Sequence, residues 1–252
     1  MLWSTPFFPS PQRDNGYDVS NYCAVDPRFG TMEDMDRLLA EAAKRDLHIV
    51  MDLVVNHCSD EHEWFRKACE DPDGKYGKYF YIENRDPLGG MPCNWRSVFG
   101  GSVWEPLPGH PDKCYLHLFH KKQPDLNWHN PKVYDEVCDV LRFWLDKGIA
   151  GFRCDVINII YKNTLSDGKK QLALTGIEHY LSTEGCHDIL QRLRKDVLSK
   201  YDCFTVGETV MVDTKMAGDL CNRERGELDM VFGFEHMECD QIGVKWFKVP
   251  YR

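Results

Sequence analysis

The sequence predicts an α/β fold in which parallel strands alternate with helices. Short runs rich in apolar and β-branched residues alternate with amphipathic segments of helical period; the runs are 48–56, 149–155, 203–208 and 228–235. Two of these runs end in an acidic residue, Asp155 and Glu208. The carboxyl ends of parallel strands converge on one face in such folds, and active sites are built there. The sequence therefore predicts a pair of carboxylates at a strand-end site.

Local sequence patterns predict the first elements of the fold. Leu2–Ser4 is a short strand remnant. A helix is expected over 31–46, because Thr31 and Asp34 resemble a capping box and apolar residues then recur at helical spacing. The run 48–56 follows and is nearly continuous in apolar residues, which is typical of a strand buried on both faces of a parallel sheet.

Residues 58–118 interrupt the alternation of strands and helices. This segment is rich in glycine, proline, aspartate and aromatic residues. A loop of this length without structure of its own is uncommon in a compact domain. We therefore expect a small inserted subdomain at 58–118, with 1–57 and 119–252 forming the α/β part of the chain.

The alternation resumes with a helix over 131–147, which has Asn130 as N-cap, Pro131 in its first turn and Gly148 as its C-terminal stop. The remaining elements are a strand at 149–155, a long loop over 156–185, a helix at 187–200, a strand at 203–208, a helix within about 213–222 and a strand at 228–235. Five strands of this kind fit either part of an eight-stranded barrel or an open doubly wound sheet. No glycine-rich phosphate loop follows any strand, which argues against a nucleotide-binding doubly wound fold.

Composition narrows the classes of function. The 252 residues are 42% hydrophobic, which is enough for a substantial core. A formal net charge of −9 without a basic block argues against a nucleic-acid partner. No apolar run approaches the roughly 20 residues of a membrane span, and residues 1–10 do not resemble a signal peptide. The 11 cysteines are scattered singly, which predicts free thiols in the cytoplasm rather than disulfides or a zinc site.

The acidic pair suggests glycoside hydrolysis. A retaining glycosidase needs a carboxylate nucleophile and a carboxylic acid about 5–5.5 Å apart, which Asp155 and Glu208 can supply from neighbouring strand ends. Arg153 precedes Asp155 by two residues, so it projects to the same side of the strand and would keep that carboxylate ionised. The alternative for these two residues is a purely structural ion pair.

Other polar and aromatic residues are weaker candidates for the site. His57 follows the strand at 48–56 and could donate a hydrogen bond to a sugar hydroxyl, although a lone histidine is more often structural. Its spacing of five residues from His62 does not favour a zinc site, and we expect no metal ion there. Phe99 and Phe119 could wall a sugar pocket or form the core of the inserted subdomain.

Four blocks of the sequence carry a resemblance to a known family: Asp14-Asn-Gly-Tyr-Asp18, Asp52-Leu-Val-Val-Asn-His57, Gly151-Phe-Arg-Cys-Asp-Val-Ile157 and Thr205-Val-Gly-Glu208. In this order and spacing they resemble glycoside hydrolase family 13, and within it the oligo-1,6-glucosidase and α-glucosidase group. Two further blocks match that group, Gln123-Pro-Asp-Leu-Asn127 and Phe232-Gly-Phe-Glu-His-Met237. The resemblance covers essentially the whole chain.

The resemblance implies a fold and roles for single residues. It implies a (β/α)8 TIM barrel with an inserted domain after the third strand, with Asp155 as nucleophile and Glu208 as general acid/base. The residues implied to hold the sugar in the cleaved-end subsite are Asp14, Tyr17, His57 and Arg153. Those that match positions on the aglycone side are Phe99, Phe119 and Gln123. Val156 matches family members that prefer α-1,6 linkages.

The match to the family is partial in length. The chain corresponds to about strands two to six of the barrel, and the first strand, the last two strands and the C-terminal β-domain have no counterpart in it. The block that supplies the family's third carboxylate also has none. We therefore expect an internal fragment of a longer enzyme, inactive by itself and without a cofactor, whereas the full-length parent could bind calcium in its first-strand loop.

The expected activity is retaining hydrolysis of terminal α-1,6-glucosidic bonds of short oligosaccharides, with α-1,4 bonds as a second class of substrate. One alternative is a sucrose isomerase or another sugar-transferring relative that shares these residues. Another is a non-catalytic relative, which would have lost the catalytic carboxylates. The expected partner is thus a small oligosaccharide, with no nucleic acid and no membrane.

Overall fold

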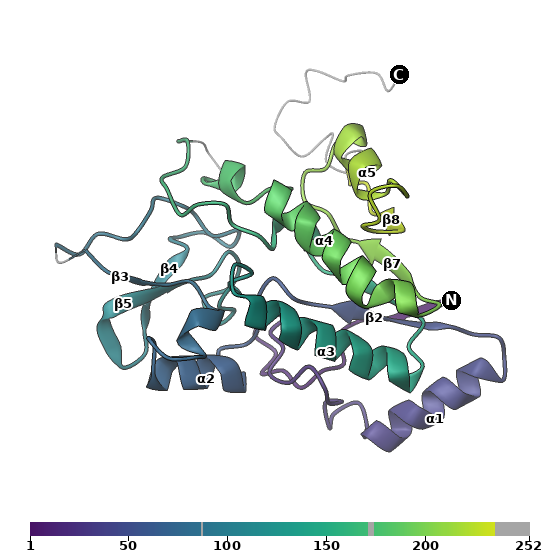
Figure 1. The fold of residues 1–252 in the computed structure, drawn as a ribbon. Helices are drawn as coiled ribbons and strands as arrows, with labels where there is room; N and C mark the ends of the chain where they lie inside the picture. Colours follow the sequence, from purple (N-terminus) through teal and green to yellow (C-terminus); the bar gives the residue numbers. More distant parts are fainter. Residues whose placement is uncertain (87, 171–173, 235–252) are drawn as a thin grey trace, which may run out of the picture.

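The computed structural model describes residues 1–86, 88–170 and 174–234. Its central element is a five-stranded, all-parallel sheet, whose neighbouring strands are β1 (Leu2–Ser4), β2 (Ile49–Leu53), β6 (Gly151–Cys154), β7 (Phe204–Gly207) and β8 (Met230–Val231). A second, antiparallel sheet contains β3 (Ile82–Asn84), β5 (His110–Leu116) and β4 (Trp104–Leu107) (Figure 1). Strand order in the parallel sheet follows chain order. Successive βα units of a barrel are arranged this way, whereas a doubly wound sheet reverses its order.

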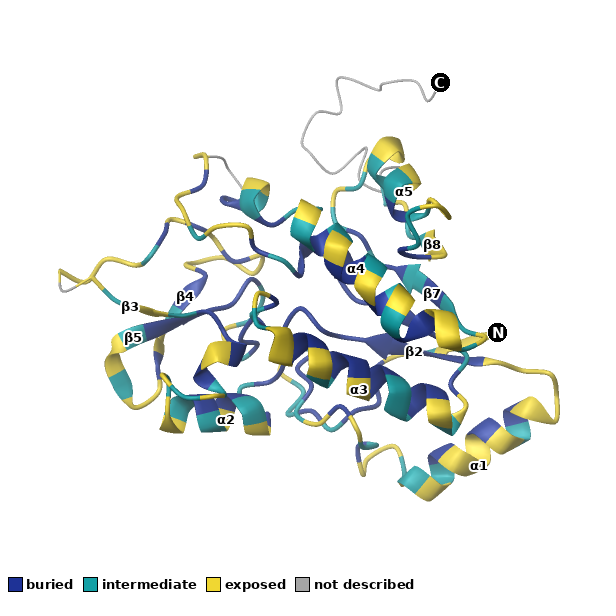
Figure 2. Ribbon diagram, in the orientation of Figure 1, coloured by how far each residue is buried: buried dark blue, intermediate teal, exposed yellow. Residues whose placement is uncertain are grey.

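Helices connect the strands and cover the parallel sheet. The described helices are α1 (Met32–Ala43), α2 (Glu63–Glu70), α3 (Pro131–Lys147), α4 (Glu184–Asp196) and α5 (Thr214–Leu220). Short 3₁₀ turns lie at Gly77–Tyr79, Ile157–Ile159, Ile177–His179 and Leu198–Lys200. Figure 2 shows that α3 and α4 turn their buried faces towards the sheet and their exposed faces to solvent. Within the described ranges, no helix is both long and apolar enough to cross a bilayer.

Capping residues explain where the helices begin and end. The capping box of Thr31 and Asp34 is confirmed at the start of α1. Asn130 caps α3, and Gly148 ends it with a φ of 103°, which favours glycine. The start predicted for the helix at 187 is wrong by three residues, because the side chain of Thr183 accepts a hydrogen bond from a backbone N–H in the first turn of α4. The helix α2 lies in the inserted range and was not predicted.

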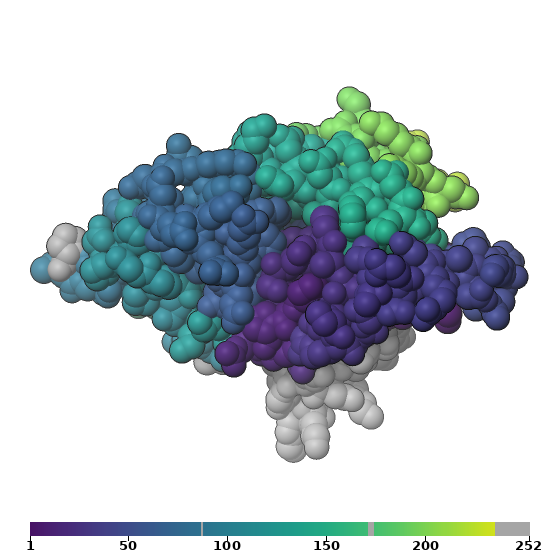
Figure 3. Space-filling view, turned by 90° about the horizontal axis from the view of Figure 1, so that it is seen from below, coloured from purple at the N-terminus to yellow at the C-terminus, as the bar shows by residue number. Residues whose placement is uncertain are grey.

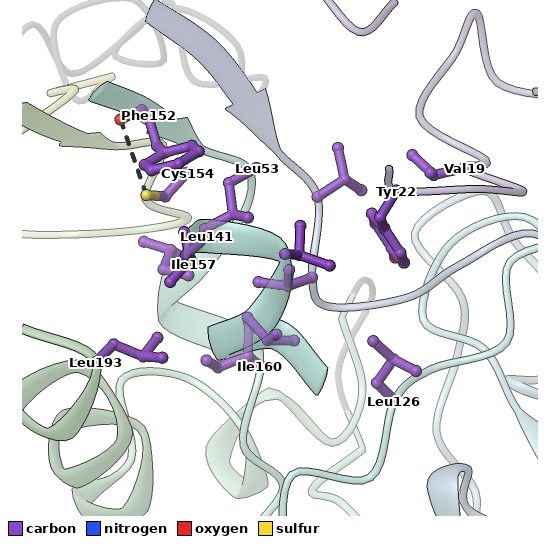
Figure 4. Close-up of a cluster of buried hydrophobic side chains, with 14 of the residues drawn as sticks. Val19, Tyr22, Leu53, Leu126, Leu141, Phe152, Cys154, Ile157, Ile160 and Leu193 are labelled. Carbon is purple, nitrogen blue, oxygen red and sulfur yellow. Dashed lines mark hydrogen bonds between the residues drawn. The ribbon is translucent and has the colours of Figure 1, made fainter. Parts of the chain in front are cut away.

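The alternation of side chains along the strands separates a core face from a polar face. Phe152 and Cys154 of β6 belong to the buried cluster that the sheet shares with α3 and α4 (Figure 4). Successive side chains of a strand point to opposite sides. Arg153 therefore faces away from these helices, as does Asp155, which follows the strand. Asp52 of β2 pairs in register with Arg153 and faces the same side.

The range 58–118 contains α2 and the antiparallel sheet, and it forms one lobe of the molecule (Figure 3, blue to teal). Its first part packs into the core of the parallel sheet through residues such as Phe65 and Phe80. Its later part forms a second buried cluster around Trp95 and Trp104. Val156, next to the candidate nucleophile, belongs to this second cluster. The inserted lobe and the strand-end face therefore share a core.

Candidate active site

Asp155 and Glu208 lie side by side, directly after the carboxyl ends of the paired strands β6 and β7. Backbone hydrogen bonds extend the strand pairing to both residues. The Asp155 N–H donates to the carbonyl of Leu53 at 2.9 Å, and the Glu208 N–H donates to the carbonyl of Cys154 at 2.8 Å. The sheet thus fixes the backbone from which both carboxylates project, and the structure brings the two predicted acids together.

Arg153 contacts three carboxylates with one guanidinium. Its Nη1 donates to Asp155 Oδ1 at 2.6 Å and to Asp52 Oδ1 at 2.7 Å, and its Nη2 lies 2.6 Å from Glu208 Oε2. Its side chain is only 6% exposed. Buried ion pairs with such contacts fix the orientation of the groups they join. The prediction that Arg153 projects towards Asp155 is confirmed, and the arginine also orients Glu208.

The groups around Asp155 shift its pKa in opposite directions. Burial raises the pKa of Asp155 well above its usual range; Arg153 lowers it, and the neighbouring Glu208 raises it again. Asp52 and Asp155 are buried, Glu208 is partly exposed, and all three carboxylates contact the same single guanidinium. The sequence predicted that Arg153 keeps Asp155 ionised. The structure shows that Arg153 alone does not determine the ionisation of Asp155. Burial and the neighbouring Glu208 therefore favour the protonated form of Asp155, against the effect of Arg153.

Val156 holds a backbone conformation that is unusual for a β-branched residue. Its φ is 38° and its ψ is 40°, in the left-handed region. In this conformation its N–H donates to Glu208 Oε2 at 3.3 Å. Strained residues of this kind cluster at active sites, where the surrounding structure enforces them. Val156 therefore contributes to the site through its main chain.

A second group of predicted residues surrounds His57. Burial lowers the pKa of His57, so the imidazole is neutral, and its Nε2 lies 3.2 Å from the carbonyl oxygen of Tyr17. The amide Nε2 of Gln123 lies 3.1 Å from the same imidazole nitrogen and donates to Asp14 Oδ2 at 2.9 Å. Gln123 is fully buried. It therefore lies between Asp14 and His57 rather than presenting a surface to a ligand.

The two predicted aromatic residues extend this group outwards. The ring of Phe119 lies 5.2 Å from the ring of His57, and the ring of Phe99 lies 6.1 Å from that of Phe119. Phe119 is half-buried against the second hydrophobic cluster, whereas Phe99 is 60% exposed. The row His57, Phe119, Phe99 thus leads from the buried polar residues to the surface of the inserted lobe.

A buried ion pair is connected to His57 through Asn56. Lys162 Nζ lies 2.8 Å from Asp125 Oδ2 and donates to Asn56 Oδ1 at 2.7 Å, and the side chains of Lys162 and Asp125 are 0% exposed. Burial lowers the pKa of Lys162, and Asp125 opposes this shift. The Asn56 amide also donates to His57 Nδ1 at 3.1 Å, because a neutral imidazole has one ring nitrogen that can accept a hydrogen bond. The ion pair therefore fixes the strand end that carries His57.

Sequence reasoning missed Asp52, Lys162 and Trp3 as members of the site. The indole Nε1 of Trp3 donates to Asp52 Oδ2 at 3.2 Å. An acidic residue inside an apolar strand was the pattern that could have identified Asp52, because a buried carboxylate needs a partner. In the part of the chain that the structure describes, no group of three or more His, Cys, Asp or Glu side chains could hold a metal ion.

Comparisons with known proteins show which family this chain resembles. Residues 1–250 match the alpha-amylase family, described as "Alpha amylase, catalytic domain". The oligo-1,6-glucosidase of Parageobacillus thermoglucosidasius is 48% identical over 100% of the chain. The solved trehalose-6-phosphate hydrolase of Bacillus licheniformis superposes with a TM-score of 0.90 at 42% identity, over 94% of the chain. The trehalulose synthase of Pseudomonas mesoacidophila does so with a TM-score of 0.87 at 38% identity, again over 94%.

The chain spans less than half the length of these relatives. It covers 45% of the oligo-1,6-glucosidase and 42% of each of the two solved structures. The solved structures share its arrangement of successive parallel strands and helices over nearly the whole chain, so the predicted partial TIM-barrel fold is confirmed.

Proposed function

The chain belongs to the alpha-amylase family, and on this premise we propose that its protein is a retaining α-glucosidase that hydrolyses terminal α-1,6-glucosidic bonds of short oligosaccharides. The observation that carries the proposal is the pair Asp155 and Glu208, held on one guanidinium at neighbouring strand ends. A retaining mechanism requires such a pair, with one carboxylate ionised and the other protonated.

The proposed reaction has two steps. In the first, Asp155 attacks the anomeric carbon while Glu208 gives its proton to the departing glycosidic oxygen, and a covalent glycosyl ester forms on Asp155. In the second, Glu208 takes a proton from water, and the resulting hydroxide displaces Asp155 from the anomeric carbon. Arg153 orients both carboxylates through the steps, and Asp14, Tyr17 and His57 are proposed to bind the glucosyl ring.

Two relatives supply the alternatives. The trehalulose synthase neighbour supports a sugar-transferring activity, in which the glucosyl ester is passed to a sugar hydroxyl instead of water. The trehalose-6-phosphate hydrolase neighbour supports a phosphorylated disaccharide as substrate. A non-catalytic relative is disfavoured because both carboxylates and Arg153 are present and in contact. The cytoplasmic location, the absence of a cofactor and the absence of a nucleic-acid partner stay predictions.

A substrate panel tests the proposal. The full-length protein is incubated with isomaltose, maltose, sucrose and trehalose 6-phosphate, and the products are separated by chromatography. We expect glucose from isomaltose as the fastest reaction. Isomeric disaccharides formed from sucrose would support the transferase instead, and preference for trehalose 6-phosphate would support the phosphorylated substrate. The 252-residue chain, assayed in parallel, is expected to be inactive because β1 and β8 are open edges of the parallel sheet among the described strands.

Val156 is expected to affect the choice of linkage. It adjoins the nucleophile and is buried in the cluster that joins the inserted lobe to the strand ends, so its shape bears on the path of the aglycone. Val156→Thr keeps the β-branch and adds a hydroxyl. We expect it to lower the ratio of kcat/KM for isomaltose to that for maltose by about tenfold, within the range that one side chain in a pocket can discriminate. An unchanged ratio would remove linkage choice from this residue.

A further inference from the structure

Trp3 lies on the polar face of the sheet, beside the residues that carry the proposed chemistry. It is in β1, in register with Val50 of β2, and its side chain shares a face with Asp52 two residues further along β2. Its indole Nε1 donates to Asp52 Oδ2 at 3.2 Å, while Asp52 Oδ1 accepts from Arg153. Both oxygens of this buried carboxylate are thus occupied, one by the indole and one by the guanidinium.

The guanidinium of Arg153 also lies close to two aromatic rings. Its Cζ is 5.4 Å from the ring centroid of Trp3 and 5.5 Å from that of Tyr17. At these distances a cation is attracted to the face of a ring. The buried Arg153 Nε has no hydrogen-bond partner among the described residues. The orientation of the guanidinium therefore depends on its Nη contacts and on the two rings.

We propose that Trp3 is a positioning residue of this active site: through its hydrogen bond to Asp52 and its ring over Arg153, it fixes the guanidinium that orients Asp155 and Glu208. The inference rests on the proposed function, because it assigns Trp3 a role in the same reaction. Trp3 itself touches neither acid nor base in the contacts described above. It acts through Asp52 and Arg153, and its loss leaves the carboxylates in place with a less constrained cation between them.

The pKa of Asp52 shows how the indole supports this cluster. Burial raises the pKa of Asp52 to about 6, whereas Arg153 and the Trp3 hydrogen bond lower it and the charge of Glu208 raises it. The titratable groups around Arg153 are Asp52, Asp155, Glu208 and Tyr17. Without the indole N–H, the carboxylate form of Asp52 loses a donor, so its pKa rises further. Asp52 then takes up a proton at a higher pH and loses the charge that faces Arg153.

Kinetics of two variants separate the two contacts of Trp3. Trp3→Phe keeps a ring but removes the N–H, and Trp3→Leu removes both. In the full-length protein we expect Trp3→Phe to lower kcat/KM for isomaltose about tenfold, as for one hydrogen bond to a charged group, and Trp3→Leu to lower it further. The acid limb of the pH profile of kcat/KM should move to higher pH in Trp3→Phe. Wild-type kcat/KM and an unmoved acid limb in this variant would overturn the proposal.

Trp64→Phe is the matched control. Trp64 contacts His62, Tyr22 and Tyr79 outside the catalytic cluster, and it loses the same N–H in the same substitution. We expect its kcat/KM to stay within about twofold of wild type, as for substitutions away from a site. An equal fall in both variants would mean that Trp3 acts through general stability, and the positioning role would be wrong.

A spectroscopic measurement tests the contact without using activity. In protein labelled with 5-fluorotryptophan, the ¹⁹F resonance missing from Trp3→Phe belongs to Trp3. We expect this resonance to shift with pH around 6 in the wild type, as Asp52 titrates, and to lose that shift in Asp52→Asn. A resonance that is insensitive to pH in the wild type would overturn the inference. Absent α-glucosidase activity with an intact titration would instead contradict the proposed function.

Discussion

Asp155→Asn is expected to reduce kcat on isomaltose by more than about a thousandfold, because the amide cannot form the glucosyl ester and no other carboxylate occupies its position. Glu208→Gln is expected to reduce it by about 10²–10⁴-fold, the range that general acid/base catalysis contributes. Both changes are nearly isosteric, so the contacts with Arg153 lose charge rather than shape. Steady-state kinetics of the full-length protein with isomaltose measure both effects.

An activated substrate distinguishes the two roles. A 4-nitrophenyl α-glucoside has a leaving group that departs without protonation. With this substrate, Glu208→Gln should form the glucosyl ester at a rate close to that of the wild type and release a burst of nitrophenol. Asp155→Asn should show no burst. If either variant keeps more than about a tenth of the wild-type rate on isomaltose, a loss of only ~1.4 kcal/mol, the role assigned to that residue is wrong.

Lys162→Met is expected to cause the largest loss of stability, about 3–5 kcal/mol, because it leaves a charged partner without compensation in the interior. Lys162 and Asp125 are both 0% exposed and 2.8 Å apart. Urea denaturation followed by circular dichroism measures the change in the free energy of unfolding. The double variant Lys162→Met/Asp125→Asn should lose less than the single one, since it also removes the buried charge of Asp125.

The surface of α3 supplies a control for this experiment. Lys132 pairs with Asp135 at 2.9 Å, but its side chain is 64% exposed. Exposed pairs contribute about 0–1 kcal/mol, so Lys132→Met should leave stability almost unchanged. A similar loss in Lys132→Met and Lys162→Met would show that burial of the ion pair is not the cause, and would contradict the prediction.

Residues whose role depends on neighbours along the chain could be predicted from the sequence. Asp155 and Glu208 each close an apolar run, and the two-residue period of a strand places Arg153 beside Asp155. The start of α1 and both ends of α3 followed from the residues that cap them, whereas α1 ends three residues before the predicted Asp46. In these cases one short segment contains both the cause and its effect.

Residues whose role depends on distant segments could not be predicted in this way. Asp52 meets Arg153 because β2 pairs with β6, and this register joins segments about one hundred residues apart. The family resemblance places Gln123 at a position on the aglycone side of the site. In the structure its amide is buried between Asp14 and His57. Lys162 lies in a loop whose sequence contains no pattern for a buried cation. Only the pairing of strands and the packing of loops create these contacts.

The hydrophobic cluster that Val156 shares with Trp104 has a consequence for the order of folding. Trp104 belongs to the antiparallel sheet, and Val156 directly follows the proposed nucleophile, so the cluster joins segments distant in sequence. Contacts of this kind form late, because chain entropy must first be lost to close the loop between them. The left-handed backbone at Val156 has little local preference to stabilise it. The conformation of Val156 beside the two acids would therefore be acquired only when the inserted lobe docks. The full-length protein, on refolding, would bury the lobe's tryptophans and gain activity in the same kinetic phase.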